Sequence, residues 1–168
     1  MDVEGIYRKS GGNSQVQQVR EAFERHTAEP ALVTEVVSDP DMDIHAVTSS
    51  LKQYLRKLPN PLITFDVYDR LLAVTQIPPE AREERVAAIT DAVKGLPRVH
   101  YEVLEFLMSH LGRIVDLKDE NLMTSMNCAV VFAPTIMRPE SIARELGDTK
   151  AKNEVVTLMV EEEDQIFR

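Results

Sequence analysis

Nine prolines divide the chain into segments whose apolar residues recur with helical spacing. Proline lacks a backbone N–H and cannot continue a helix beyond its first turn, so each proline marks a boundary or a turn. Between these boundaries apolar residues return every three or four positions, and the alternation typical of strands lasts for only a few residues. The prolines are Pro30, Pro40, Pro59, Pro61, Pro78, Pro79, Pro97, Pro134 and Pro139. The pattern predicts an all-α fold, a single-domain bundle of about seven helices.

Turn residues and caps set the expected helix boundaries. Asp43 precedes a segment with helical periodicity and is a suitable N-cap, and Pro59 with Pro61 stops that segment. We expect residues 28–42 to form an irregular connector in which Val33–Val37 is briefly extended. The predicted helices span Asn13–His26, Ile44–Leu58, Phe65–Thr75, a segment opened by Pro79 and closed by Gly95, a segment opened by Pro97, Asn121–Phe132 and Ala151–Phe167.

Each predicted helix has an apolar face that we expect to point into the core. The Asn121–Phe132 segment is apolar nearly all round, so we expect it to be the central and most buried helix. On the other helices the predicted core residues are Val16, Val19, Phe23, Val47, Leu51, Tyr54, Leu55, Leu58, Val86, Ile89, Val93, Leu96, Val103, Phe106, Leu107, Leu111, Ile114, Val155, Leu158, Met159 and Ile166.

The charge and cysteine content exclude several classes of protein. The 168 residues carry a formal net charge of −9, and because phosphate contacts need concentrated lysine and arginine, we expect no nucleic-acid partner. The single cysteine, Cys128, excludes an intramolecular disulfide and indicates a reducing compartment such as the cytoplasm. No signal peptide is visible. The longest charge-free stretch, residues 121–137, holds 17 residues, whereas a membrane-spanning helix needs about 20, so we expect no direct membrane insertion.

The segment Gly5–Gly12 places Arg8 in a glycine-flanked turn before a helix start. Glycine permits backbone conformations that other residues avoid and allows another surface to approach closely. One interpretation is a helix-entry turn with a solvated arginine. The other is a guanidinium that is held out on a loop and inserted into another molecule.

The second predicted helix carries Lys52 and Arg56 four positions apart, one turn above the other on one face. Two cations at this spacing repel each other and slightly destabilise an isolated helix. They could form an ordinary solvated face, or they could bind an acidic partner.

An asparagine, Asn127, lies within the most apolar segment. Burying an amide without hydrogen-bond partners costs about 1–3 kcal/mol, so the side chain needs a partner. It could bond the backbone of an internal loop, or lie at a surface where another protein docks; the two do not exclude each other. The four histidines and Cys128 show no metal-ligand spacing, and we expect no metal site.

Together the three segments resemble the RhoGAP domain family, the GTPase-activating proteins of Rho-type small GTPases. The family pattern G-x-x-R-x-S-G matches Gly5–Gly11. The pattern L-K-x-[YF]-[LF]-R-x-L-P-x-P-L matches Leu51–Leu62, and N-x-A-x-V-F-x-P matches Asn127–Pro134. The resemblance covers essentially residues 1–168 in order and spacing. The run Ser10–Phe23 and the connector Asp39–Asp43 are most similar to fungal members that also carry LIM domains.

The resemblance implies a role for each matching residue. Arg8 would be the arginine finger inserted into the nucleotide pocket of the GTPase. Lys52 and Arg56 would contact its switch region or support the finger loop, Asn127 would contact the partner, and Lys9 would lie at the rim. The residues that would shape the motifs are Gly5, Ser10, Gly11, Pro59, Pro61 and Pro134, the last at the end of its helix.

The resemblance also implies the partner and excludes a resident cofactor. The chain has no G-x-x-x-x-G-K-[ST] phosphate loop, so a Rho-, Rac- or Cdc42-type GTPase would bring the GTP, the Mg²⁺ and the attacking water. The domain itself would be no enzyme but an activator, recruited to the membranes where such GTPases are anchored.

Two departures from the family pattern leave alternatives open. The family usually has a further helix before the finger loop, and without it one flank of the core would be uncovered. The family also commonly has glycine before the helix-ending proline and asparagine directly after it. In this chain Ala133 and Thr135 occupy these two positions, and the change could weaken one polar contact. A catalytically silent GTPase-binding module and a purely structural helical scaffold therefore remain alternatives; the presence of Arg8 favours activity.

Overall fold

The computed structural model describes residues 1–167, which are helical and contain no β-strand. Over this range the chain forms ten α-helices and two short 3-10 helices, η1 and η2. Their bounds are α1 Asn13–Glu24, α2 Pro30–Val37, α3 Ile44–Arg56, α4 Phe65–Ala73, η1 Val74–Gln76, α5 Arg82–Val93, α6 Arg98–Val115, α7 Lys118–Asn121, α8 Ser125–Ile136, η2 Ile142–Arg144, α9 Thr149–Glu161 and α10 Glu163–Ile166. The predicted all-α class is confirmed.

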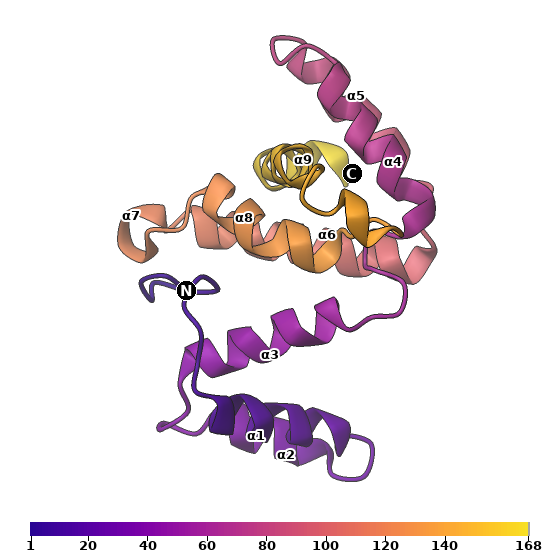
Figure 1. Cartoon of the computed structure of the whole chain (residues 1–168). Coiled ribbons are helices and arrows are strands. Elements are labelled where there is room, and N and C mark those ends of the chain that lie inside the picture. The colour runs from indigo at the N-terminus through magenta and orange to yellow at the C-terminus, as the bar shows by residue number, and fades with distance from the viewer. Residues whose placement is uncertain (168) are drawn as a thin grey trace.

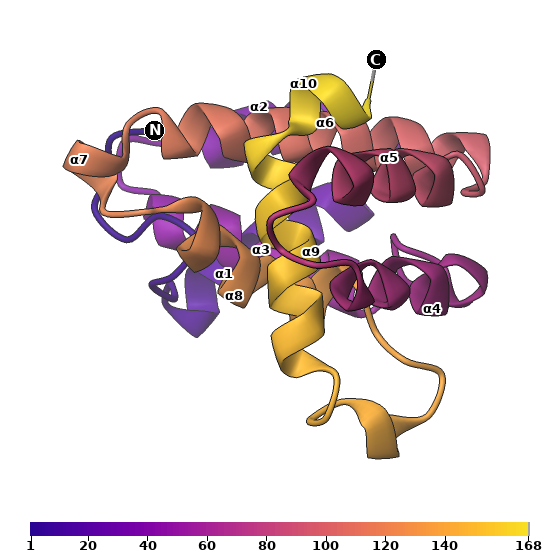
Figure 2. The same ribbon diagram turned by 90° about the horizontal axis from the view of Figure 1, so that it is seen from above.

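The helices form a small layer and a larger bundle (Figure 1). Helices α1 and α2 lie together at one end, α3 crosses above them, and α4 to α10 make up the rest of the molecule. Figure 2 shows α9 crossing the larger part, with α8 on one side and the pair α4 and α5 on the other. The N-terminal loop of residues 3–12 runs between α3 and the α7–α8 region.

Two hydrophobic clusters hold these parts together. The smaller cluster centres on Val19, Ala22 and Val36, between α1 and α2. The larger one fills the bundle around α8 and α9, the pair of helices with the most extensive contact. Because α3 packs Val47 against the small cluster and Leu55 into the large one, it joins the two.

Helix α3 begins where its sequence predicts. The Asp43 carboxylate accepts a hydrogen bond from the backbone N–H of His45 at 2.9 Å, which satisfies one of the donors left open at a helix N-terminus. The helix ends at Arg56, before Pro59. Pro59 is exposed and Pro61 is buried, and the residues between α3 and α4 then turn the chain into the core.

Two helices were not predicted, and several predicted helices have different bounds. The seven predicted helices correspond to α1, α3, α4, α5, α6, α8 and the pair α9 and α10, while α2 and α7 are additional. The single helix predicted over Ala151–Phe167 is divided at Glu162. The expected extended segment Val33–Val37 is part of α2, since Pro30 at its start and packing on α1 outweigh its β-branched composition. The predicted helix Asn121–Phe132 begins at Ser125 and continues to Ile136.

Several residues predicted to face the core are exposed. The predicted core residues of α5 and α9 are buried. On other helices the buried face is rotated relative to the predicted one. Helix α1, for instance, buries Ala22 instead of Phe23. The predicted core residues that are exposed are Phe23, Leu51, Tyr54, Val103 and Phe106. Within residues 1–167, no helix has both the length and the apolar character that crossing a membrane requires.

Candidate functional site

Arg8 lies on the outer side of a turn whose inner side is buried. Gly5, Ile6 and Tyr7 are buried, whereas Arg8 is exposed. The backbone N–H groups of Arg8 and Lys9 both donate to the carbonyl oxygen of Gly5, each at 2.9 Å, which closes the turn. The guanidinium makes no hydrogen bond or ion pair with the residues that the structure describes. It is therefore available to another molecule.

Two glycines shape this turn for different reasons. Gly5 has a φ of +70°, in the left-handed region that other residues adopt at a cost. Gly11 lies directly on the first turn of α3, where a Cβ atom would come within 2.2 Å of the backbone nitrogen of Ala46. The N–H of Gly11 donates to the Ser49 hydroxyl at 3.2 Å. Gly5 thus permits the turn, and Gly11 allows it to contact α3.

The backbone of Tyr7, the residue before the arginine, is strained, and the contacts of its buried ring hold it in this conformation. Its φ is +67°, a conformation that costs a residue with a Cβ about 1–2 kcal/mol. Its ring packs edge-on against His110 and Phe132, with centroids 5.7 and 5.0 Å away. The hydroxyl shares a 2.7 Å hydrogen bond with Nε2 of His110, and burial raises the pKa of Tyr7 to about 12. Burial of this ring therefore fixes the direction in which Arg8 leaves the loop.

Lys52 supports the loop from α3. Its half-buried ammonium donates a hydrogen bond to the carbonyl oxygen of Tyr7. Burial, and then the nearby charge of Arg56, lower the pKa of Lys52. Arg56, one turn further along α3, is exposed and forms no ion pair within residues 1–167. The two cations thus differ: Lys52 contacts the arginine loop and Arg56 faces solvent.

The neighbours of Arg8 on the loop have unequal roles. Lys9 forms an exposed ion pair with Glu4 at 3.1 Å, so its ammonium is engaged at the rim of the turn. Ser10 is exposed and makes no hydrogen bond with the described part of the chain. The geometry gives Ser10 no structural function, in contrast to Gly5 and Gly11.

Asn127 is half-buried and bonds a loop backbone. Its side-chain amide donates to the carbonyl oxygen of Leu122 at 3.0 Å, and its backbone N–H donates to the Thr124 hydroxyl that caps α8 at 3.2 Å. This is the first of the two alternatives that the sequence leaves open. The partial exposure of the side chain keeps the second one open as well.

The sequence prediction missed a second asparagine, Asn121, which is fully buried. Its amide donates to the carbonyl oxygen of Ile114 at 2.7 Å, and its side-chain oxygen accepts from the N–H of Met123 at 2.8 Å. Its own carbonyl accepts from the N–H of Gly5 at 2.8 Å. Asn121 therefore attaches the arginine loop to the turn between α6 and α8. The sequence could have indicated Asn121 only through the free-energy cost of burying an amide without hydrogen-bond partners. The sequence analysis applied that argument to Asn127 and not to Asn121.

Helix α8 presents an apolar surface on the same side of the molecule as the arginine loop. Met126 and Val130, one turn apart, are each about half exposed, at 50% and 52%, so α8 is not buried all round as expected. Pro134 does not end this helix, which continues to Ile136. The proline lies in the last turn of the helix. Because it lacks a backbone N–H, one hydrogen bond is missing there, and the rest of the helix keeps its hydrogen bonds.

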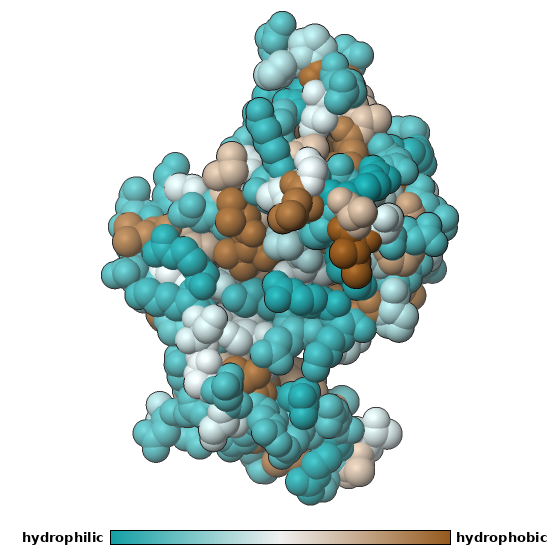
Figure 3. Space-filling view, viewed as in Figure 1, coloured by the Kyte–Doolittle hydropathy of each residue, from teal (hydrophilic) through white to brown (hydrophobic). Residues whose placement is uncertain are grey.

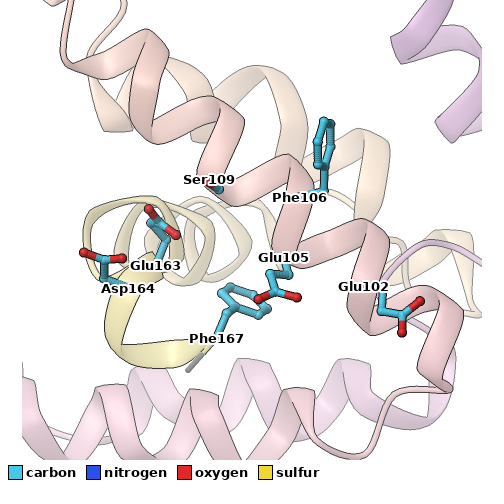
Figure 4. A pocket seen from close by; sticks show the side chains of 7 residues that line it. All are labelled: Glu102, Glu105, Phe106, Ser109, Glu163, Asp164 and Phe167. Carbon is cyan, nitrogen blue, oxygen red and sulfur yellow. The ribbon is translucent and has the colours of Figure 1, made fainter.

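The described hollows of the surface lie away from this site and are acidic. One, of about 440 Å³, lies between α6 and α10 (Figure 4). Its walls include Glu102, Glu105, Glu163 and Asp164. A second hollow lies between the start of α5 and the end of α9, and its walls include the carboxylates of Glu80, Glu83, Glu84 and Glu162. Carboxylate walls repel phosphate groups, so neither hollow is suited to a nucleotide.

Comparison with protein families gives one match, to the RhoGAP domain, over residues 1–141. The chain belongs to the RhoGAP domain family. The predicted family is confirmed, while the similarity to fungal members with LIM domains stays a prediction.

The curated relatives of this RhoGAP domain are longer proteins. It is 35% identical over 99% of its length to the probable Rho-type GTPase-activating protein 4 of Schizosaccharomyces pombe, and spans 17% of that protein. It is 34% identical over 98% of its length to beta-chimaerin of Rattus norvegicus, and spans 54% of it. It is 36% identical over 99% of its length to N-chimaerin of Homo sapiens, and spans 36% of it.

Solved structures show the same fold. The BH domain from Graf, the GTPase regulator associated with focal adhesion kinase, superposes with a TM-score of 0.80 at 32% identity, over 99% of this chain and 85% of that one. Human Rho GTPase activating protein 15 superposes with a TM-score of 0.84 at 27% identity, over 99% of this chain and 76% of that one.

The two departures near Pro134 are inside the RhoGAP fold. Ala133 and Thr135 are both fully buried. The Thr135 hydroxyl donates to the carbonyl oxygen of Val131 at 3.2 Å, so it is engaged within α8. Neither side chain reaches the surface that carries Met126, Asn127 and Val130.

Proposed function

We propose that this RhoGAP domain stimulates GTP hydrolysis by Rho-family small GTPases, with Arg8 supplied in trans as an arginine finger. The observation that supports this most strongly is the combination of an unpaired, exposed guanidinium and a loop backbone that is held from several sides. A solvated surface arginine needs no such support. A catalytic one does, because a misplaced group loses most of its effect on rate.

The chemistry explains why an arginine is suited to this task. Phosphoryl transfer spreads negative charge over the oxygens around the γ-phosphate. A fixed cation in a water-poor site stabilises this charge more in the transition state than in the ground state. The planar guanidinium stays ionised and donates several hydrogen bonds in a fork. The partner contributes the nucleotide, the Mg²⁺ and the attacking water, because this chain has no phosphate loop.

The surface around the loop is suited to docking a GTPase. Arg56 offers an unpaired cation, and Met126 and Val130 offer an apolar surface beside the partly exposed Asn127. Lys52 acts mainly on the finger loop through the Tyr7 carbonyl. We expect the partner to be a Rho-, Rac- or Cdc42-type protein, met in the cytoplasm at the membranes to which such GTPases are anchored.

Single-turnover GTP hydrolysis by Rho-, Rac- and Cdc42-type proteins tests this function. We expect the wild-type domain to accelerate at least one of them, and Arg8→Ala to lose about 10³–10⁵-fold of the stimulated rate, the range known for supplied arginine fingers. Arg8→Lys, which keeps the charge but not the fork, should recover little. Because Arg8 is exposed, both variants should melt as the wild type does.

The outcome separates the alternatives. If wild type and Arg8→Ala stimulate equally, Arg8 is no finger. If the wild type binds a GTPase without stimulating it, the domain is a silent binding module, and if it does neither, it is a scaffold.

A further inference from the structure

The segment between α8 and α9 exposes two aliphatic side chains almost completely. Ile142 is 91% exposed and Leu146 is 90% exposed, whereas the next most exposed large apolar side chain, Phe106, reaches 72%. Single exposed apolar residues are common on soluble proteins. It is less common to find two such residues four positions apart that are both almost fully exposed. It is less common still when the segment that carries them is well anchored. Their burial against another protein would be a source of binding free energy.

A charged network holds this segment on α4. Arg144, between the two aliphatic residues, donates from Nη2 to Oδ1 of Asp69 at 2.7 Å, and its Nε forms an ion pair with Oδ2 of Asp148 at 3.2 Å. Its guanidinium carbon lies 5.5 Å from the ring centroid of Tyr68. The Tyr68 hydroxyl donates to Asp148 at 2.9 Å. The backbone that carries Ile142 and Leu146 is thus attached at its middle and at its end.

A second, more deeply buried contact anchors the same segment on α9. The ammonium of Lys152, a residue only 1% exposed, forms an ion pair with Glu145. The Thr149 hydroxyl donates to the carbonyl oxygen of Glu145 at 2.9 Å. A buried charge without its partner is costly, so these contacts restrict the segment. The two apolar side chains are therefore presented on an ordered backbone, which lowers the entropy cost of docking.

The segment around η2 lies on the same face of the molecule as α8. Figure 2 shows it projecting beyond the N-terminal end of α9, next to α4. On the face shown in Figure 3, hydrophobic patches lie over α8 and over the segment that leads through η2 into α9. The exposed apolar residues in these places are Met126, Val130, Ile142 and Leu146. The pair thus extends the surface that is expected to receive the GTPase.

We propose that Ile142 and Leu146 form a second docking element for the GTPase that receives Arg8, binding an apolar patch on that protein outside its nucleotide site. This inference rests on the proposed function. The pair lies on a different segment from the arginine loop and is uncharged, so it contributes to affinity and leaves the rate of the bound complex unchanged.

The test compares the Ile142→Ser/Leu146→Ser double variant with the wild type and with Val99→Ser. Val99 is also exposed, at 68%, but lies on α6. Titration with the GTPase that the wild type stimulates most, loaded with a non-hydrolysable GTP analogue, gives Kd. Single-turnover hydrolysis at saturating domain gives the rate. We expect the double variant to raise Kd about tenfold or more, as for the loss of two buried interface anchors. The rate of hydrolysis at saturating domain should not change. Val99→Ser should change neither.

Other results overturn the inference. If the wild type stimulates the GTPase and the double variant has an unchanged Kd, the inference is wrong and the proposed function stands. Sedimentation showing a wild-type dimer that the double variant loses, or vesicle binding that it loses at unchanged Kd, assigns the pair to a second copy or to a lipid surface. A wild-type domain that neither binds nor stimulates any of the GTPases overturns both proposals.

Discussion

The finger loop and the segment around η2 present opposite kinds of groups and are held by different sets of contacts. The finger loop exposes a cation and is held by a buried aromatic ring, Tyr7, with Lys52 on its carbonyl. The η2 segment exposes two aliphatic side chains and is held by ion pairs around Arg144 and Lys152. In the η2 segment the outward-facing groups differ in character from those that fix the backbone, whereas in the finger loop a second cation, Lys52, helps to hold the loop that presents Arg8.

The comparison shows how one surface can separate two tasks. A catalytic cation needs a defined position, and the strained φ of Tyr7 is stable because the ring below it is buried. A docking element needs order but less exact placement, since apolar contacts are not directional. Changes at the anchors of the finger loop should therefore reduce the rate, and changes at the anchors of η2 should reduce affinity.

After Arg8→Ala, the largest effect is expected from Lys52→Met, which removes the ammonium from the Tyr7 carbonyl. The finger would then sample other directions, and a displacement of about 1 Å costs on the order of 10² in rate. Single-turnover hydrolysis at saturating domain measures this. The matched control is Lys57→Met, an exposed lysine at the end of the same helix, which should keep the wild-type rate. Equal rates for the two variants would show that Lys52 does not support the finger.

Gly11→Ala should destabilise the contact between the finger loop and α3. A Cβ at this position would lie 2.2 Å from the backbone nitrogen of Ala46, and overpacking of this kind costs about 1–3 kcal/mol. Gly12→Ala, next to it, has no atom within 4 Å of the added Cβ and should change stability by about 0.5 kcal/mol or less. Chemical denaturation compares the two. A Gly11→Ala domain as stable as Gly12→Ala would mean that the loop does not lie against α3 in solution.

Arg144→Met should loosen the η2 segment with a smaller effect. Exposed ion pairs contribute about 0–1 kcal/mol, so the melting temperature should shift little, while amide hydrogen exchange in residues 142–148 should accelerate. Affinity for the GTPase should fall a few-fold at an unchanged saturated rate. Arg98→Met, which breaks an exposed ion pair with Glu102 on α6, serves as the control. A fall in the rate itself would contradict the separation of the two tasks.

The smallest effect concerns pH and His110. Burial, and then the charge of Arg113, lower its pKa below the ordinary value of 6.5. As pH falls below about 6.5 the unfolded chain takes up the proton before the folded one, so His110 lowers the stability of the fold in acid. The loss should level off below the folded pKa. Denaturation midpoints at pH 7.5 and 5.5 should differ less for His110→Gln than for the wild type; an identical difference would show that His110 does not face a buried environment.

Much of the fold can be predicted from the sequence because its helices carry local signals. Asp43 and Pro59 bracket α3, and the apolar spacing of α5 and α9 identifies their buried faces. Helix α2 could not be predicted, because its valines favour extended structure and only packing on α1 makes it helical. Phe23 and Phe106 were assigned to the core because a spacing pattern cannot tell which edge of a broad apolar face meets a neighbour.

The site could be predicted in part for the same reason. Arg8 and Lys52 stand in short motifs whose spacing is visible along the chain. The contact of Tyr7 with His110 joins residues 103 positions apart, and no local pattern reports it. Nor could the exposure of Ile142 and Leu146 be predicted, since it depends on ion pairs between the η2 segment and α4 and α9.

The most direct test of the account is the affinity of the domain for a GTPase that carries GDP with aluminium fluoride, a mimic of the transferring phosphoryl group. We expect the wild type to bind this complex more tightly than the same GTPase with a GTP analogue, because Arg8 stabilises the transition state more than the ground state. Arg8→Ala should bind the GTP-analogue complex as the wild type does and lose the additional affinity. If Arg8→Ala keeps that additional affinity in full, the guanidinium does not reach the nucleotide and the central claim is wrong.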